Sequence, residues 1–95
     1  MKLIKSERFI SDVTEIRDAK LIAIIVARLS RVAEGAFGDS KSVGDGVSEL
    51  RIHYGAGYRI YYTVRNRKIV FLLCAGQKSD QKKDIKTAKE LAKEI

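Results

Sequence analysis

Residues 47–64, VSELRIHYGAGYRIYYTV, alternate between apolar and polar side chains on both sides of a glycine-rich segment. Alternation with a period of two is typical of half-buried β-strands, and two such runs joined by a few residues that include glycine predict a β-hairpin. We expect one face of this hairpin to be buried in a hydrophobic core. With a three-residue loop over residues 55–57, the expected core pairs are Leu50–Tyr62, Ile52–Ile60 and Tyr54–Tyr58.

The alternate face of the hairpin carries an unusual set of side chains. Arginines that lie close together on a sheet repel one another, so such a face costs stability unless an anion lies beside it. Guanidinium groups bind phosphate oxygens bidentately and stay charged at neutral pH, which indicates a phosphate ligand. The alternative is structural, with Glu49 neutralising Arg51 and Tyr61 stacking on an arginine. In the same register, the pairs on this face are His53–Arg59, Arg51–Tyr61 and Glu49–Thr63.

Two helices are expected before the hairpin. Ser6 is the expected N-cap of the first helix, and Asp18 that of a second helix that runs to Glu34 and ends at Gly35. Apolar residues at helical spacing predict which side of the second helix faces the core, with Ile24 placed on the polar side. The expected core stripe is Ile22, Ile25, Val26, Leu29, Val32 and Ala33.

Strand and turn signals predict the rest of an α+β domain over residues 1–95. Lys2–Lys5 has the length of a short strand, and the apolar run KIVFLLCA predicts a central strand covered on both faces. Asp45–Gly46 and Asn66–Arg67 are expected turns, and Ser79 is the expected N-cap of a last helix. The predicted architecture is two N-terminal helices, an antiparallel sheet of about four strands and a C-terminal helix, with the helices gathered on one face.

The charge balance favours a polyanionic partner. Nineteen Lys and Arg against twelve Asp and Glu give a net charge of +7, which suits nucleic acid or an acidic protein, although a merely basic surface would give the same balance. Cys74 is the only cysteine and His53 the only histidine, which excludes an internal disulfide, a cysteine-based zinc site and a histidine pair for a metal. Cys74 lies in an apolar run and is interpreted as a small buried hydrophobe. We expect no metal and no cofactor.

The N-terminus MKLIKSERF lacks the apolar segment of a signal peptide, and no apolar run approaches the ~20 residues that a transmembrane helix needs. A cytoplasmic protein without a membrane partner is therefore expected.

The polar face of the hairpin also suggests a reaction, the metal-free cleavage of RNA. That reaction needs a base for the 2′-hydroxyl, positive charge at the phosphate and an acid for the departing 5′-oxygen. Arg51 and Arg59 would stabilise charge, because an arginine cannot act as a base near neutral pH. His53 could serve as acid or base, and we expect neighbouring cations to lower the pKa of Tyr61.

Two longer stretches, GDSKSVGDGVSELRIHYGAGYRIYY and LLCAGQKSDQKKDIKTAKELA, resemble short toxins of the RelE/HigB superfamily. More narrowly, they resemble its phage-derived, Gp49-like addiction-module killer subgroup. The resemblance implies a bacterial type II toxin that cleaves mRNA on the ribosome without a metal and is neutralised by a helix-turn-helix antitoxin. Operator DNA would be bound only through that antitoxin. By position, Arg51, Arg59 and Lys78 are the implied basic residues of the active face, and His53 and Tyr61 complete the candidate catalytic set.

Lysines outside the hairpin are candidate contacts to the RNA backbone. A basic stripe on the last helix is usually no more than a solvated face, which is the structural alternative for these lysines. The candidate RNA-binding residues are Lys41, Lys82 and Lys86.

Two departures from the subgroup leave other activities open. Its members commonly read GPGYR and GDKS where this chain has Ala56 and Gln77. One alternative is a ParE-like poison of DNA gyrase, which would bind a protein and cleave no RNA. The other is an inactive relative that only binds its antitoxin.

Overall fold

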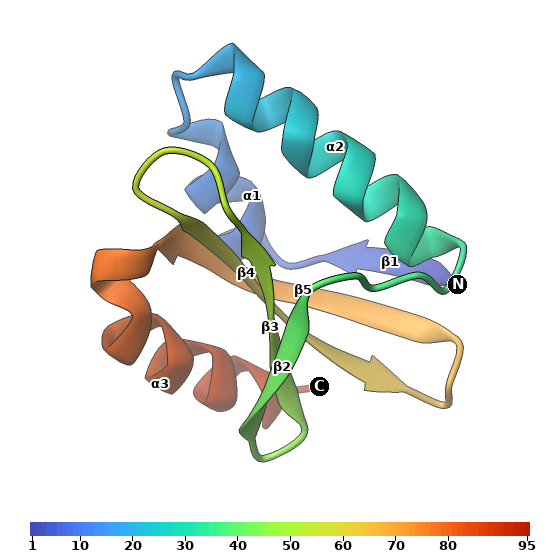
Figure 1. The fold of residues 1–95 in the computed structure, drawn as a ribbon. Helices are drawn as coiled ribbons and strands as arrows, with labels where there is room; N and C mark the ends of the chain where they lie inside the picture. The colour runs from blue at the N-terminus through green and yellow to red at the C-terminus, as the bar shows by residue number, and fades with distance from the viewer.

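A computed structural model describes residues 1–95 and contains five strands, three α-helices and one short 3₁₀ helix. Figure 1 shows their arrangement. The order along the chain is β1 (Lys2–Lys5), α1 (Glu7–Thr14), α2 (Ala19–Ala33), β2 (Ser40–Gly44), β3 (Val47–Ile52), β4 (Tyr58–Arg65), β5 (Ile69–Gln77), η1 (Lys78–Asp80) and α3 (Gln81–Ala92). The α+β class, the two N-terminal helices and the C-terminal helix are confirmed.

All five strands form one sheet in the order β1-β5-β4-β3-β2. Strands β2 to β5 form the expected antiparallel meander, but β1 lies parallel to β5 at the edge, so the sheet is mixed. The prediction of an antiparallel sheet was wrong at this edge. The partners of β1 lie at the far end of the chain, and no local turn signal joins the two strands.

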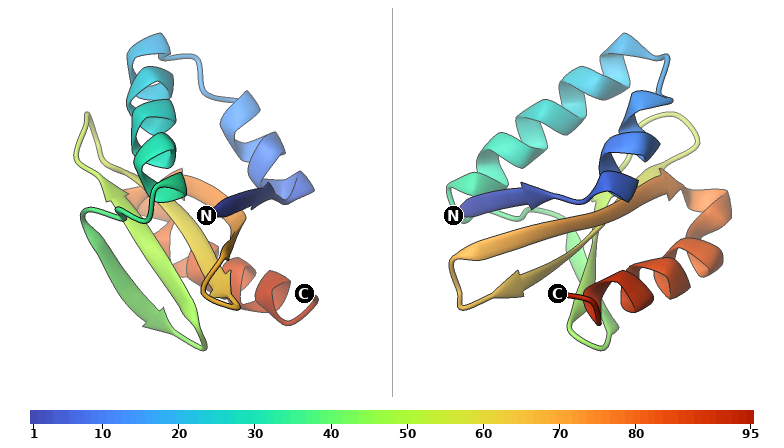
Figure 2. Two further views of the ribbon diagram at one scale, coloured as in Figure 1. Left: turned by 90° about the vertical axis from the view of Figure 1, so that its right-hand side faces the viewer. Right: turned by 180° about the vertical axis from the view of Figure 1, so that it is seen from behind.

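Helices cover both faces of the sheet, with α1 and α2 on one side and α3 on the other (Figure 2). The expectation that all helices would share one face was wrong, whereas the prediction of a central strand covered on both faces is confirmed by β5. Val70 and Leu72 of β5 belong to the core beneath α1 and α2, and Leu73 and Cys74 to the core beneath α3. None of the helices combines the length and apolar content needed to cross a membrane.

The caps of the first two helices are the expected ones. The Ser6 hydroxyl accepts a hydrogen bond from the Phe9 N–H at 3.0 Å, and the Asp18 carboxylate accepts from Lys20 N–H at 2.9 Å. Gly35 follows α2 with a φ of +91°, a conformation that glycine adopts without steric cost. Ser79 does not cap the last helix, because residues 78–80 form η1 and α3 begins at Gln81 without a side-chain cap.

The buried stripe of α2 is rotated from the predicted one. Ile22 and Val26 are 40% and 61% exposed, whereas Leu21 and Ile24 pack against the core. The cause is Arg28, whose guanidinium donates to the carbonyl oxygens of Arg51 at 2.7 Å, Phe37 at 3.1 Å and Asp39 at 3.2 Å. These three bonds turn the Arg28 side of α2 toward the sheet.

The hairpin turns at a different length from the predicted one. Strand β3 ends at Ile52 and β4 begins at Tyr58, so the loop spans residues 53–57 instead of 55–57. Ile52 pairs with Tyr58 and Leu50 with Ile60, two residues out of the expected register. Because a shift of two residues keeps every side chain on its face, the predicted core and polar faces are retained.

Candidate functional site

Two adjacent rungs of the sheet place the polar hairpin residues on the face that α3 covers. Cross-strand partners point to the same face of a sheet. One rung is therefore Lys41–Glu49–Tyr61–Cys74, and the next is Arg51–Arg59–Gly76. Arg51 and Arg59 are direct cross-strand partners. The rungs bring both arginines to the end of the sheet where β5 runs into η1.

Glu49 lies at the centre of this group and is 1% exposed. Its carboxylate accepts hydrogen bonds from Arg51 Nε at 3.1 Å and from Gln81 Nε2 at 2.9 and 3.2 Å. Arg59 Nε lies 3.7 Å from the same carboxylate. A buried carboxylate needs such partners, because an unpaired charge in the interior is strongly unfavourable.

Arg59 and Lys78 meet beside Gly57. Gly57 has a φ of +92°, and the Lys78 N–H donates to its carbonyl oxygen at 3.1 Å, which ties the end of β5 to the hairpin loop. A Cβ atom at Gly57 would lie 3.4 Å from Lys78 Cβ and 3.9 Å from Arg59 Nη1. The glycine therefore leaves room for both side chains at one point.

We call Arg51 and Arg59, which lie against Glu49, and Lys78, which meets Arg59 beside Gly57, the basic cluster. The three cations differ in access, because the Arg51 side chain is 28% exposed, the Arg59 side chain is 8% exposed and Lys78 lies on the surface. Three cations against one carboxylate leave an excess of positive charge. Such an excess suits a phosphate ligand that approaches Arg51 and Lys78 from the solvent.

Comparison with known proteins places the chain in a family. Residues 8–94 match the family described as "Phage derived protein Gp49-like". The chain belongs to the Gp49-like family. This family is related to the toxins of toxin–antitoxin systems. A protein of Haemophilus influenzae (strain ATCC 51907 / DSM 11121 / KW20 / Rd), described only as an uncharacterized protein, is 49% identical over 87 residues, which cover 92% of this chain and 88% of that protein.

Two candidate catalytic residues of the Gp49-like chain have surroundings that differ from the predicted ones. His53 lies in the loop, not in the strand opposite Arg59, and its exposed imidazole pairs with the Asp39 carboxylate. Tyr61 is on the predicted face but is fully buried, and its hydroxyl has no hydrogen-bond partner. Burial, followed by the nearby Glu49 carboxylate, raises the pKa of Tyr61, which is the opposite of the predicted direction.

The candidate RNA-binding lysines are all exposed, one on β2 and two on α3. Lys41, on β2, is exposed and is the cross-strand partner of Glu49. Lys82 and Lys86 are exposed on α3, the helix that also supplies Gln81. Cys74 is a buried thiol, as expected, and burial raises its pKa to about 12.

The sequence interpretation named Glu49 as a partner of Arg51, which their ion pair at 3.1 Å confirms, but it missed Gln81 as a further partner of Glu49. It treated Glu49 only as a neutralising neighbour of Arg51, although a carboxylate in phase with two arginines on one face is itself the signal for a buried ionic centre. Gln81 carries no such signal, because its approach to Glu49 depends on how η1 delivers the chain to α3. Only the tertiary structure brings it to the sheet.

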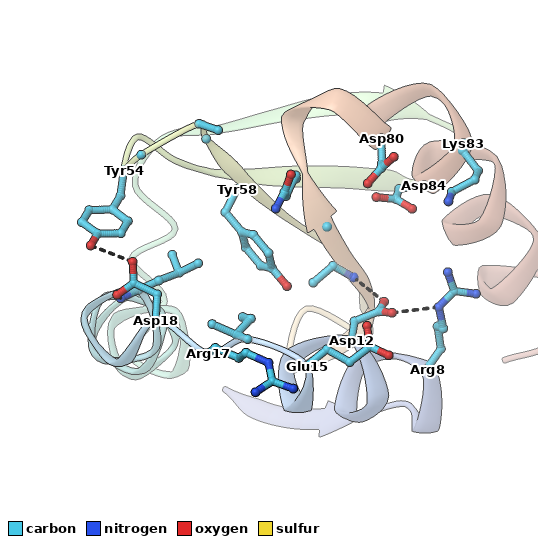
Figure 3. Close-up of a pocket in the computed structure, with 18 residues that line it drawn as sticks. Arg8, Asp12, Glu15, Arg17, Asp18, Tyr54, Tyr58, Asp80, Lys83 and Asp84 are labelled. Atoms are coloured by element: carbon cyan, nitrogen blue, oxygen red, sulfur yellow. Dashed lines mark hydrogen bonds and ion pairs between the residues drawn. The ribbon is translucent and has the colours of Figure 1, made fainter.

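Gly57 also borders a hollow of about 690 Å³, formed by α1, the hairpin loop, the end of β5 and the start of α3 (Figure 3). The sequence interpretation did not anticipate it. Its lining includes Tyr54 and Tyr58 and three cations, Arg8, Arg17 and Lys83. Carboxylates outnumber these cations, so we call the hollow the acidic cleft. They are Asp12, Glu15, Asp18, Asp80 and Asp84.

Proposed function

We propose that this protein is the toxin of a type II toxin–antitoxin module and that it cleaves mRNA on the ribosome without a metal ion. The basic cluster supports this proposal most strongly. Arg51 and Arg59 are built on strands and lie against the buried Glu49, which fixes their geometry, and Lys78 is tied to the hairpin loop through its backbone N–H. The three cations together carry more charge than Glu49 compensates. Family membership supports the toxin role.

The proposed reaction is attack of a ribose 2′-oxygen on the adjacent phosphorus. The bond from phosphorus to the 5′-oxygen breaks, which leaves a 2′,3′-cyclic phosphate and a 5′-hydroxyl. Arg51 and Lys78 contact the phosphate oxygens. Arg59, which is largely buried, stabilises the negative charge without direct contact. The Lys78 ammonium donates a proton to the departing 5′-oxygen, and a group of the ribosome accepts the proton of the 2′-hydroxyl.

We assign no proton transfer to Tyr61 or His53. Tyr61 is enclosed, and His53 belongs to the loop with its imidazole bound to Asp39. This revises the catalytic set to Arg51, Arg59 and Lys78. Lys41, Lys82 and Lys86 are proposed to hold the RNA backbone on either side of it.

The partner proposed for neutralisation is a helix-turn-helix antitoxin in the cytoplasm, which also provides the only contact to operator DNA. An acidic segment of such a partner would be attracted to the basic cluster and to the lysines of α3. Charge reversal at Arg51, Lys78 and Lys82 together should weaken the complex. A complex of unchanged affinity would contradict this mode of neutralisation.

The decisive experiment is mapping of mRNA 5′ ends in a purified translation system. The expected result is cleavage inside codons in the ribosomal A site, abolished by Lys78→Gln. The matched control is Lys68→Gln, an exposed lysine in the turn between β4 and β5 that should leave cleavage unchanged. Intact mRNA, or equal loss in both variants, would overturn the proposal.

A gyrase poison is the second candidate, and one observation favours it. The positions of His53 and Tyr61 leave the basic cluster without the acid and base that the sequence predicts. Such a toxin would trap DNA breaks and induce the SOS response while mRNA stays intact. An inactive relative would cause neither effect, and its induction without the antitoxin would not arrest growth.

A further inference from the structure

Asp84 is a buried carboxylate without a partner. It is 3% exposed, its Oδ2 atom accepts no hydrogen bond, and no cation lies within ion-pair distance of it. Leaving such a group unpaired costs stability. Figure 3 shows its carboxylate at the acidic cleft, near Asp80 and Lys83. A donor from outside the chain would satisfy this carboxylate.

Gly76 is the residue that makes room for Asp84. A Cβ atom at Gly76 would lie 2.1 Å from Asp84 Oδ2, closer than any real contact allows. The φ of Gly76 is not positive, so the backbone conformation does not require glycine there. The requirement is the space for the carboxylate, which places Asp84 beneath the rung Arg51–Arg59–Gly76.

We propose that the acidic cleft binds the guanidinium group of an arginine side chain presented by a basic segment of a partner protein. The charges favour a cation, since five carboxylates line the cleft against three cations in a chain that is otherwise strongly basic. One of those cations, Arg8, is already engaged by Asp12, with Nε and Oδ1 3.0 Å apart. The second oxygen of Asp12 accepts from the Ala75 N–H at 2.9 Å, which fixes this carboxylate in place.

The side chains around Asp84 suit a guanidinium better than a metal ion. No three His, Cys, Asp or Glu side chains converge closely enough to hold a metal. Tyr58 directs its hydroxyl into the cleft, and burial raises its pKa to about 12, so it stays a neutral phenol (Figure 3). A planar guanidinium can donate to several acceptors at once and stack on a tyrosine ring, which a compact ammonium does less well.

The size of the cleft favours a peptide over a small cation. About 690 Å³ is within the roughly 300–1,000 Å³ typical of sites for drug-sized ligands, and it exceeds what one guanidinium fills. Exposed residues at its rim, Glu15 and Asp18, leave room for peptide backbone on either side of the arginine. This inference does not depend on the proposed RNA cleavage. That reaction is assigned to the basic cluster, which would bind an anion, whereas the acidic cleft would bind a cation.

The test is a titration of the purified protein, followed by amide NMR spectra, with a blocked Gly-Arg-Gly peptide. Saturable shifts are expected at Gly55, Gly57 and Gly76, which line the cleft. Asp84→Asn keeps the shape and removes the charge, and should weaken binding by about tenfold or more, as for loss of a hydrogen bond to a charged group. Asp45→Asn, an exposed carboxylate that pairs with Lys89 outside the cleft, is the matched control and should bind as the parent does.

Related peptides test whether the cleft recognises the guanidinium group itself. A Gly-citrulline-Gly peptide, which is neutral, should not bind, and Gly-Lys-Gly should bind more weakly. Absence of saturable shifts, equal binding of the citrulline peptide, or an affinity unaffected by Asp84→Asn would overturn the proposal. Free agmatine that binds as tightly as the arginine peptide would overturn its assignment to a protein segment. If Asp84→Asn fails to fold, Asp80→Asn and Tyr58→Phe serve instead, and unchanged affinity in both would overturn the proposal.

Discussion

Arg51 and Arg59 share one buried carboxylate, that of Glu49, but they differ in what surrounds the rest of each side chain. The Arg59 side chain is 8% exposed, so water cannot replace it, whereas that of Arg51 is 28% exposed. We expect Arg59→Ala to lower the free energy of unfolding by about 3 kcal/mol and Arg51→Ala by about 1 kcal/mol. Urea denaturation measures both values.

Arg59→Met is the control for this comparison, because it keeps much of the buried stem without the charge. Its stability should lie between those of the parent and Arg59→Ala. A larger loss for Arg51→Ala than for Arg59→Ala would contradict the assignment of Arg59 as the buried member. Toxicity lost in Arg59→Ala must therefore be corrected for folding, whereas loss in Arg51→Ala reports directly on the site.

Tyr61→Phe removes a hydroxyl that is fully buried and has no partner. Removing an unsatisfied buried group is neutral or stabilising, so the free energy of unfolding should stay the same or rise by about 1 kcal/mol. Growth arrest by the variant should match that of the parent. Tyr62→Phe is the matched control, because the Tyr62 hydroxyl is hydrogen-bonded to Ser40, and it should lose about 1 kcal/mol. A nontoxic, well-folded Tyr61→Phe would restore Tyr61 to the catalytic set.

Asp84 predicts a pH dependence of stability. Burial, and next the nearby Asp80 carboxylate, raise the pKa of Asp84 above its value in the unfolded chain. Between these two pKa values the folded state holds the extra proton, so the contribution of Asp84 to stability falls as the pH rises through that window. Above both pKa values the cost is complete. Asp84→Asn should therefore be more stable there by on the order of 1 kcal/mol, or about 4–8 °C in Tm.

Thermal melts over a pH series test this prediction. The advantage of Asp84→Asn should shrink on acidification toward the unfolded pKa, where the carboxyl is neutral in both states. Asp45→Asn, at an exposed turn position, should show no such pH-dependent advantage. An advantage of Asp84→Asn that stays constant at every pH would mean that ionisation is not its cause.

At the scale of whole elements, the sequence predicts what depends on local rules. Turns such as Asn66–Arg67 follow from the residues themselves, and both of these have positive φ, 56° and 58°. The polar and apolar faces of the hairpin follow from alternation, which survives a register shift of two residues. The register itself was missed, because loop length depends on Tyr54, whose hydroxyl is held by Asp18 of another element at 2.9 Å.

Two features that the sequence does not reveal, the bulge of β5 and the acidic cleft, also depend on tertiary structure. Alternation along β5 is interrupted by a bulge, since Tyr61 pairs with Cys74 but Tyr62 pairs with Leu72. Leu73 is the extra residue, and it puts two consecutive side chains of β5 beneath α3. An unbroken apolar run gives no sign of such a bulge, and the acidic cleft is equally invisible because its carboxylates come from separate elements.

The helix starts give a prediction at this scale. Ser6 caps α1 and its hydroxyl also donates to the Leu73 carbonyl oxygen at 2.7 Å, at the bulge of β5. Ser6→Ala should therefore lower the free energy of unfolding by about 1–2 kcal/mol. Ser79→Ala should change it by less than about 0.5 kcal/mol, because Ser79 caps no helix and is exposed. Equal losses in chemical denaturation would show that Ser79 caps α3 in solution.

Across the whole molecule, charge is sorted into two regions that share Gly57. Arg59 and Lys78 of the basic cluster approach this glycine, and the acidic cleft, whose lining includes Lys83 of α3, borders it as well. We therefore expect a polyanion to be attracted to the basic region instead of to the chain as a whole.

Salt dependence of RNA binding tests this sorting. The affinity for a short single-stranded RNA, measured by fluorescence anisotropy, should fall as salt rises, because bound lysines release counterions from phosphates. Lys41→Gln and Lys82→Gln should each reduce the slope of log affinity against log salt by about 0.7 if each lysine contacts one phosphate. Lys68→Gln removes the same charge from the turn between β4 and β5 and should leave the slope unchanged. An equal reduction in all three variants would mean that the RNA responds to net charge alone and that no defined track of lysines guides it to the basic cluster.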